Sequence, residues 1–167
     1  MLTSLLLLTH FAHATEIGTD KKLGVGVATG DVYVAFSGKY WLSEKSGLTA
    51  MLGTSFVYQS LRVGYESNIV TFGQDWSFGQ LPVYWHADVE LSAYTVPYAF
   101  YPRIGAGGGA GVALQFESLP AEVFVNAGLT IGYTGYCSSS YGVLGGAGLR
   151  VGCLIRPLGT AGGRWYF

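Results

Sequence analysis

The chain has 167 residues, enough for one domain, and half of them are hydrophobic while only 11% are charged. Soluble domains carry about 25% charged residues and disordered segments carry few apolar ones, so the composition excludes disorder and disfavours an ordinary wetted surface. The net charge of −1 gives no electrostatic reason to expect nucleic acid as a partner.

The N-terminus has the features of a secretory signal peptide. Leu5–Leu8 form a short apolar run, and Ala12–Ala14 has the small-x-small pattern of a signal-peptidase site. We therefore expect residues 1–14 to be a signal peptide and residues 15–167 to form one domain. No Lys or Arg precedes the leucines, so a buried N-terminal helix is the alternative.

Beyond this segment, no window reaches the about 20 apolar residues that a membrane-spanning helix needs. Short stretches instead alternate between apolar and polar residues, which is the period of a β-strand. In residues 81–94, for example, Val89 and Leu91 share one face while Asp88 and Glu90 share the other. The pattern predicts eight strands, at residues 22–30, 31–43, 47–57, 81–94, 98–107, 111–117, 121–135 and 142–153.

Three segments are harder to assign. Residues 58–80 contain strand-like pieces, and we expect the two flanking strands to extend past the membrane there and to be joined by an extracellular loop. An extra hairpin is the alternative. A second loop is expected at 135–141. The glycine-rich residues 105–111 are expected to form a flexible turn. The last strand is either 142–153 or a further pairing through 160–167.

The two faces of the predicted strands differ in kind. One face is built from Leu, Val, Ile and Phe, and the other holds Gly, Ser and the strand charges, as in a transmembrane barrel with a polar lumen. Nine basic and ten acidic residues are too few to wet an outer surface, so we expect an all-β, up-and-down antiparallel transmembrane β-barrel. A soluble lipocalin-like barrel with the opposite orientation is the alternative. The predicted lumen charges are Lys39, His86, Asp88, Glu90, Arg103, Glu117, Glu122 and Arg150.

The two cysteines are expected to be free thiols. Cys137 and Cys153 lie near opposite ends of one predicted strand or its loop. Sixteen extended residues at about 3.3 Å each cannot return to disulfide distance.

The chain ends in aromatic residues, Trp165, Tyr166 and Phe167, which resemble the C-terminal signal read by the barrel-assembly machinery of outer membranes. Together with the strand pattern, the sequence resembles the small eight-stranded outer-membrane barrels of Gram-negative bacteria, the class of the OmpA transmembrane domain and OmpX.

Within this class, it is more similar to an uncharacterised barrel family with a "SGKYWLS" strand (37–43), a "WSF" segment (76–78) and a "HAD" strand (86–88). "PAEVFVNAGL" (120–129) also fits. The resemblance implies a monomer in the outer membrane that contacts outer-membrane lipid and is delivered by periplasmic chaperones and the barrel-assembly machinery. It implies no biochemical activity.

The polar face of residues 86–92 could in principle carry chemistry, because it combines His86, Asp88, Glu90 and Ser92. Residues two apart on a strand are about 6.6 Å apart, too far for direct contact between nucleophile and base. We therefore expect an ion-pair network, in which Asp88 and Glu90 pair with Arg103, and a non-enzymatic structural or interaction role. A narrow ion channel is the alternative, and an enzyme acting on envelope lipid is a third hypothesis. No second histidine shares a ligand spacing with His86, so neither a metal nor a cofactor is expected.

Overall fold

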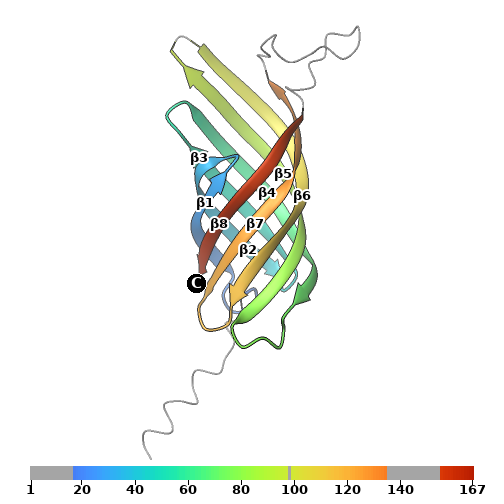
Figure 1. Ribbon diagram of the computed structural model, residues 1–167. Coiled ribbons are helices and arrows are strands. Elements are labelled where there is room, and N and C mark those ends of the chain that lie inside the picture. Colours follow the sequence, from blue (N-terminus) through green and yellow to red (C-terminus); the bar gives the residue numbers. More distant parts are fainter. Residues whose placement is uncertain (1–16, 98, 135–154) are drawn as a thin grey trace, which may run out of the picture.

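The computed structural model describes residues 17–97, 99–134 and 155–167. These residues form a closed antiparallel barrel in which each strand pairs with the next in sequence and the last pairs with the first (Figure 1). The expected all-β, eight-stranded, up-and-down fold is therefore confirmed. The strands are β1 (Leu23–Gly30), β2 (Tyr33–Ser43), β3 (Ser46–Thr54), β4 (Tyr58–Phe72), β5 (Gly79–Val96), β6 (Ala99–Phe116), β7 (Ala121–Thr134) and β8 (Ile155–Tyr166).

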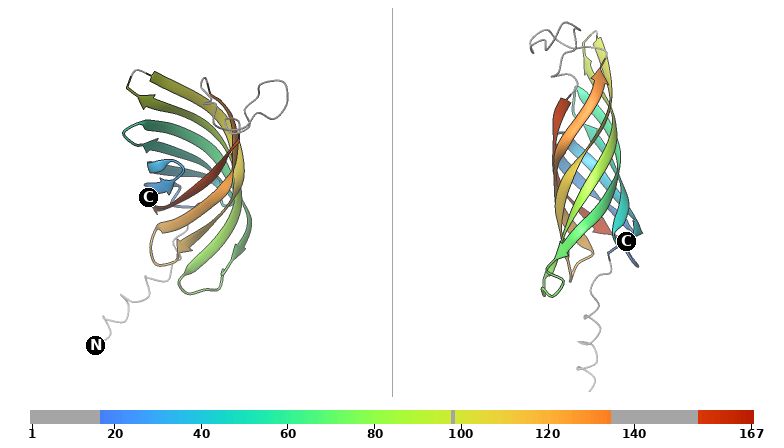
Figure 2. Two further views of the ribbon diagram at one scale, coloured as in Figure 1. Left: turned by 45° about the horizontal axis from the view of Figure 1, so that its top comes forward. Right: turned by 90° about the vertical axis from the view of Figure 1, so that its right-hand side faces the viewer.

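The barrel has two unlike ends. The end that holds the C-terminus, here called the lower end, also holds the connections 44–45, 73–78 and 117–120 (Figure 1). The opposite, upper end holds the turns 31–32 and 55–57 and the β5–β6 connection. Because β5 and β6 have 18 residues each and β1 only 8, the β5–β6 hairpin extends well beyond the β1–β2 hairpin at the upper end (Figure 2).

The structure corrects two of the predicted connections. Residues 58–72 form β4, paired in register with β3 and β5, so the loop and the extra hairpin expected over 58–80 are both wrong. Only residues 73–78 connect β4 to β5, and they lie at the lower end. The turn expected at 105–111 is also wrong, because residues 99–116 are one continuous strand. The prediction missed β4 and divided β6 into two strands. These two errors cancel, so the predicted total of eight strands is unchanged.

The final strand is settled in favour of the second alternative. β8 pairs with β7 on one side and with β1 on the other, and so closes the barrel through residues 155–166. The predicted signal peptide, the 135–141 loop, the 142–153 strand and both cysteines lie outside the described residues.

The orientation expected for the two strand faces is confirmed in the described strands. Leu91 and Val125 are each 51% exposed on the outer wall, whereas Glu90, next to Leu91, is 1% exposed in the interior. Glycines make room for the large interior side chains. A Cβ atom at Gly111 would lie 2.3 Å from Oδ1 of Asn126 and 2.6 Å from the Tyr84 ring. Glycines on the inward face therefore leave the volume that the large interior side chains occupy.

Candidate functional site in the barrel interior

The barrel interior contains every charged side chain of the described strands. None of them is exposed on the outer wall. With Asp31 from the β1–β2 turn, five acidic groups face five basic groups, so their charges balance. The set is Asp31, Lys39, Arg62, Glu66, Asp88, Glu90, Arg103, Glu122, Arg156 and Arg164.

The group nearer the upper end, here called the upper cluster, surrounds Glu90. The Nη2 atom of Arg156 lies 2.8 Å from both carboxylate oxygens of Glu90, and the Tyr58 hydroxyl donates a hydrogen bond of 2.9 Å to Oε1. Arg103 and Arg62 approach Oε2 at 3.4 and 3.5 Å. Three guanidinium groups from different strands therefore share one buried carboxylate.

Asp31 is the second carboxylate of the upper cluster. It accepts hydrogen bonds from Arg62 and from the Thr160 hydroxyl (2.7 Å), and Arg156 lies 3.5 Å away. Burial alone would raise the pKa of Asp31, but the hydrogen bonds and charge of Arg62, with help from Thr160 and Arg156, lower it below its ordinary value. Asp31 therefore stays ionised and holds the β1–β2 turn against β4 and β8.

Arg103 is the least satisfied member of the upper cluster. Its Nη1 and Nη2 atoms are buried and make no hydrogen bond to a described residue, and its one ion pair within that part of the chain is the 3.4 Å contact with Glu90. Gly132 leaves space for the guanidinium, because a Cβ there would lie 2.7 Å from Nη2. With three guanidiniums and two carboxylates, the upper cluster carries one excess positive charge.

The lower cluster contains two neighbouring ion pairs among the described residues. Arg164 donates to Glu122 at 2.7 Å, and both side chains are 0% exposed. The second pair is Lys39 with Glu66, at 2.8 Å. The Trp41 ring covers the Lys39 ammonium at 3.9 Å, a cation–π contact that shields this pair from the lower mouth.

His86 and Asp88 form a further pair on β5. Nδ1 of His86 lies 2.9 Å from Oδ2 of Asp88, while Nε2 is buried and has no hydrogen-bond partner among the residues that the structure describes. No hydrogen bond in the described part of the chain joins this pair to a hydroxyl nucleophile, so the relay that a serine hydrolase requires is not assembled there. Over the same residues, no group of three or more His, Cys, Asp or Glu side chains is arranged to hold a metal ion.

Most of the predicted lumen residues do lie inside the barrel. Lys39, His86, Asp88, Glu90, Arg103 and Glu122 are interior, and the expected pairing of Glu90 with Arg103 is present. Asp88 pairs with His86 instead of Arg103.

Two predicted members of the network differ from the rest. Glu117 follows the end of β6 and is exposed at the lower end, so its assignment to the lumen is wrong. Arg150 lies outside the described residues.

The prediction from the sequence missed five interior charges: Asp31, Arg62, Glu66, Arg156 and Arg164. Arg62 and Glu66 alternate with Leu61, Val63 and Tyr65, so assigning a strand to residues 58–72 would have found them. Arg156 and Arg164 lie on β8, whose position was left open. Asp31 is in a turn, where alternation gives no signal.

The C-terminal aromatic residues divide between the two sides of the wall. Tyr166 is buried in the interior, while Trp165 and Phe167 are exposed. Gly24 on β1 is opposite Tyr166, and a Cβ there would lie 2.5 Å from the tyrosine ring. The C-terminal residues therefore complete the seam between β8 and β1.

Comparisons with known proteins do not assign a function to this interior. No family model, curated protein or solved structure matches the chain. None of the helices among the described residues is long and apolar enough to cross a membrane.

Proposed function

We propose that this chain is an outer-membrane β-barrel of a Gram-negative envelope, with a structural or interaction role and a lumen closed by ion pairs. One observation carries the proposal: the outer wall exposes large apolar side chains on every described strand and no charged side chain of any of them. Soluble monomers rarely expose contiguous apolar patches larger than a few hundred Å². An apolar wall around a polar lumen is the arrangement of a barrel solvated by lipid.

The described charges outside the lumen support an orientation for this barrel. Asp20, Lys21, Lys22, Glu44, Lys45, Asp75 and Glu117 all lie at the lower end or in the segment leading to β1. We place this end in the periplasm, where periplasmic chaperones and the barrel-assembly machinery would meet the C-terminal residues Trp165, Tyr166 and Phe167. This location agrees with the resemblance to the OmpA and OmpX class.

A single substitution on the outer wall separates a membrane barrel from a soluble one. Leu129 lies near the middle of β7 and is 58% exposed. In a bilayer, Leu129→Arg should lower the free energy of unfolding by about 2–4 kcal/mol, because a guanidinium would face hydrocarbon. In a soluble barrel, the same surface change should cost about 0.5 kcal/mol or less.

The measurement is urea unfolding of the protein reconstituted in phospholipid vesicles, followed by tryptophan fluorescence. Thr29→Arg, an exposed polar position at the upper end of β1, is the control, and its cost should be small in either case. Location is tested in parallel by heat-modifiable gel mobility of the protein extracted from outer membranes. A barrel that stays soluble without detergent and tolerates Leu129→Arg would refute the proposal.

The second candidate is a narrow ion channel, and the upper cluster favours it. The Arg156 side chain is 30% exposed, whereas the side chains of the lower ion pairs are at most 3% exposed, so of the described lumen charges those of the upper cluster are more open to water and ions. Eight strands leave an interior just wide enough for side chains, so conduction would require ion pairs to exchange partners. Single-channel steps in planar bilayers that change with Arg103→Gln would favour the channel.

The lipid-modifying enzyme has less support. His86, Asp88, Glu90 and Ser92 have little or no exposure to the outer wall because they face the interior. A substrate lipid outside the barrel would not reach them.

A further inference from the structure

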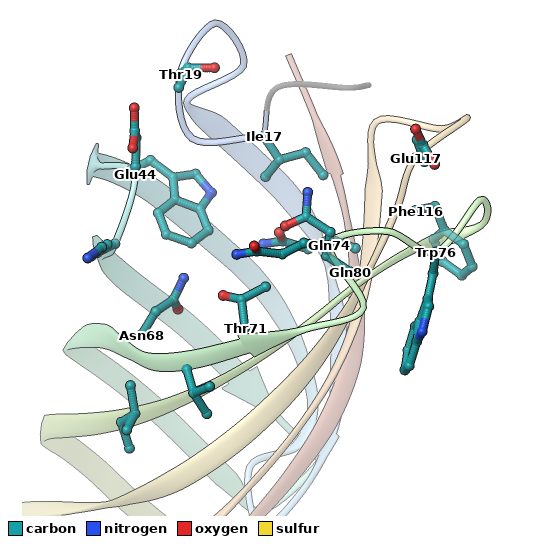
Figure 3. Close-up of a pocket in the computed structure, with 15 residues that line it drawn as sticks. Ile17, Thr19, Glu44, Asn68, Thr71, Gln74, Trp76, Gln80, Phe116 and Glu117 are labelled. Carbon is teal, nitrogen blue, oxygen red and sulfur yellow. The ribbon is translucent and has the colours of Figure 1, made fainter. Parts of the chain in front are cut away.

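The lower mouth of the barrel contains a cavity of about 480 Å³, in the range of small-molecule sites. It is lined by the β2–β3 turn, the end of β4, the 73–78 loop and the neighbouring ends of β5 and β6 (Figure 3). Four side-chain amides contribute to the lining, from Asn68, Gln74, Gln80 and Gln115. This cavity is separate from the ion pairs of the lumen, which lie deeper in the barrel.

Several hydrogen-bonding groups of this cavity lack a partner. The indole of Trp41 is 2% exposed, and its buried Nε1 makes no hydrogen bond to any described residue. The side-chain amides of Gln74 and Gln80 make no hydrogen bond with another described residue. Gln115 is opposite Gln80 in the β5–β6 register, and its side chain makes a long hydrogen bond of 3.4 Å to Glu122. Since a buried donor without a partner is costly, the unpaired Trp41 Nε1 indicates a position for an acceptor.

An aromatic platform stands at the rim of the same cavity. Trp76 lines it and stacks on Phe78, with ring centroids 5.2 Å apart and planes 19° apart. Gly73 is required beneath this platform, because its φ of +69° is left-handed and a Cβ there would lie 2.2 Å from the Trp76 ring. Figure 3 shows Gln74 and Gln80 in the cavity, with Trp76 and Phe116 to one side.

We propose that this cavity binds a neutral saccharide. A sugar hydroxyl both donates and accepts hydrogen bonds, and a primary amide offers one acceptor and two donor hydrogens, so amides from several segments suit a ring that carries hydroxyls on adjacent carbons. The Trp76 indole, which is 42% exposed at the rim, adds an apolar aromatic contact for the C–H groups of the ring. This inference goes beyond the proposed function and does not require the barrel to be in a membrane.

Other ligand classes fit less well. The charged lining residues, Glu44, Lys45 and Glu117, have no positive excess that would select an anion. An extended peptide would normally add to a free sheet edge, and a closed barrel has none.

The test is titration of the folded barrel in detergent micelles with chitotetraose and maltotetraose, followed by tryptophan fluorescence and calorimetry. We expect saturable binding, weakened about tenfold or more by Gln80→Leu and by Trp76→Ala. The matched controls are Gln59→Leu, an exposed glutamine at the upper end, and Trp85→Ala, an exposed tryptophan of the outer wall; both should bind as the unmodified protein does. Heat-modifiable mobility checks that each variant is folded.

The outcomes separate clearly. Absence of saturable binding up to about 10 mM would overturn the proposal, as would equal binding of tetra-alanine or equal loss in the control variants. Sedimentation with purified peptidoglycan that Gln80→Leu abolishes would support a cell-wall glycan as the source of the sugar. Binding of the soluble tetrasaccharides alone would support a free oligosaccharide. A soluble barrel that still binds sugar would refute the membrane location but leave this inference standing.

Discussion

The two ends of the lumen neutralise buried charge in different ways. In the lower cluster, Arg164 and Glu122 form a closed pair with no exposure to solvent. In the upper cluster, Glu90 is shared by three guanidiniums, of which Arg156 is 30% exposed. A buried charge that loses its only partner is strongly destabilising, whereas a shared, partly hydrated charge can be compensated by neighbours, water or ions. The lower pairs therefore act as fixed structural contacts, and the upper cluster is the adaptable part of the interior.

The largest effect is expected for Glu122→Gln. It removes the carboxylate to which the buried Arg164 guanidinium is hydrogen-bonded, so the free energy of unfolding in vesicles should fall by about 3–5 kcal/mol in a urea titration. Glu44→Gln, the same change at an exposed lower turn, should cost about 0.5 kcal/mol or less. The double variant Glu122→Leu, Arg164→Met should recover much of the loss, because no unpaired charge remains. A single variant as stable as the unmodified barrel would show that the pair is not the closed contact described here.

The alternating pattern of the sequence predicted some of the strands and failed for others. Alternation identified the inward face of β5 and β7, because one residue in two must point inward along an extended strand. It failed in β4, where the register shifts between Asn68 and Val70 and the later residues lose the alternating pattern. In residues 105–111 glycine suggested a turn, yet the strand pairs continuously with β7 across this stretch.

Most of the ion pairs could not be predicted from one sequence. Arg164 lies opposite Glu122 in the β7–β8 register, but the position of β8 was left open. Arg62 with Asp31 joins positions whose proximity depends on barrel closure and strand tilt. Local patterns carry no information on either. Glu90 with Arg103 could be anticipated because β5 and β6 are neighbours along the chain.

A smaller effect is expected for Glu90→Gln at the upper end. The variant removes the shared carboxylate, but Arg62 is still paired with Asp31, and Arg156 is partly exposed to water. We therefore expect the free energy of unfolding to fall by about 2 kcal/mol. Mobile anions can replace part of the missing charge in a hydrated site. The loss should therefore shrink between about 0.05 M and about 1 M sodium chloride, where charges are screened.

The salt dependence of Glu90→Gln is best measured in the same urea titrations as Glu122→Gln. The Glu122→Gln loss should not change with salt, because its site excludes ions. Equal salt responses at the two positions would contradict the distinction between a closed lower pair and an adaptable upper cluster.

The smallest effect concerns the pH dependence of the upper cluster through Asp31. Arg62, Thr160 and Arg156 hold the pKa of Asp31 below its value in the unfolded chain. The carboxylate therefore contributes stability at pH values above the unfolded pKa. That contribution is lost as the pH falls through the folded-state pKa. Asp31→Asn should therefore cost about 1 kcal/mol at neutral pH, and the difference from the unmodified barrel should vanish in acid. Urea titrations of both proteins between neutral pH and strongly acidic pH measure this difference in the free energy of unfolding. A difference that stays constant with pH would mean that Asp31 acts through the shape of the turn and not through its charge.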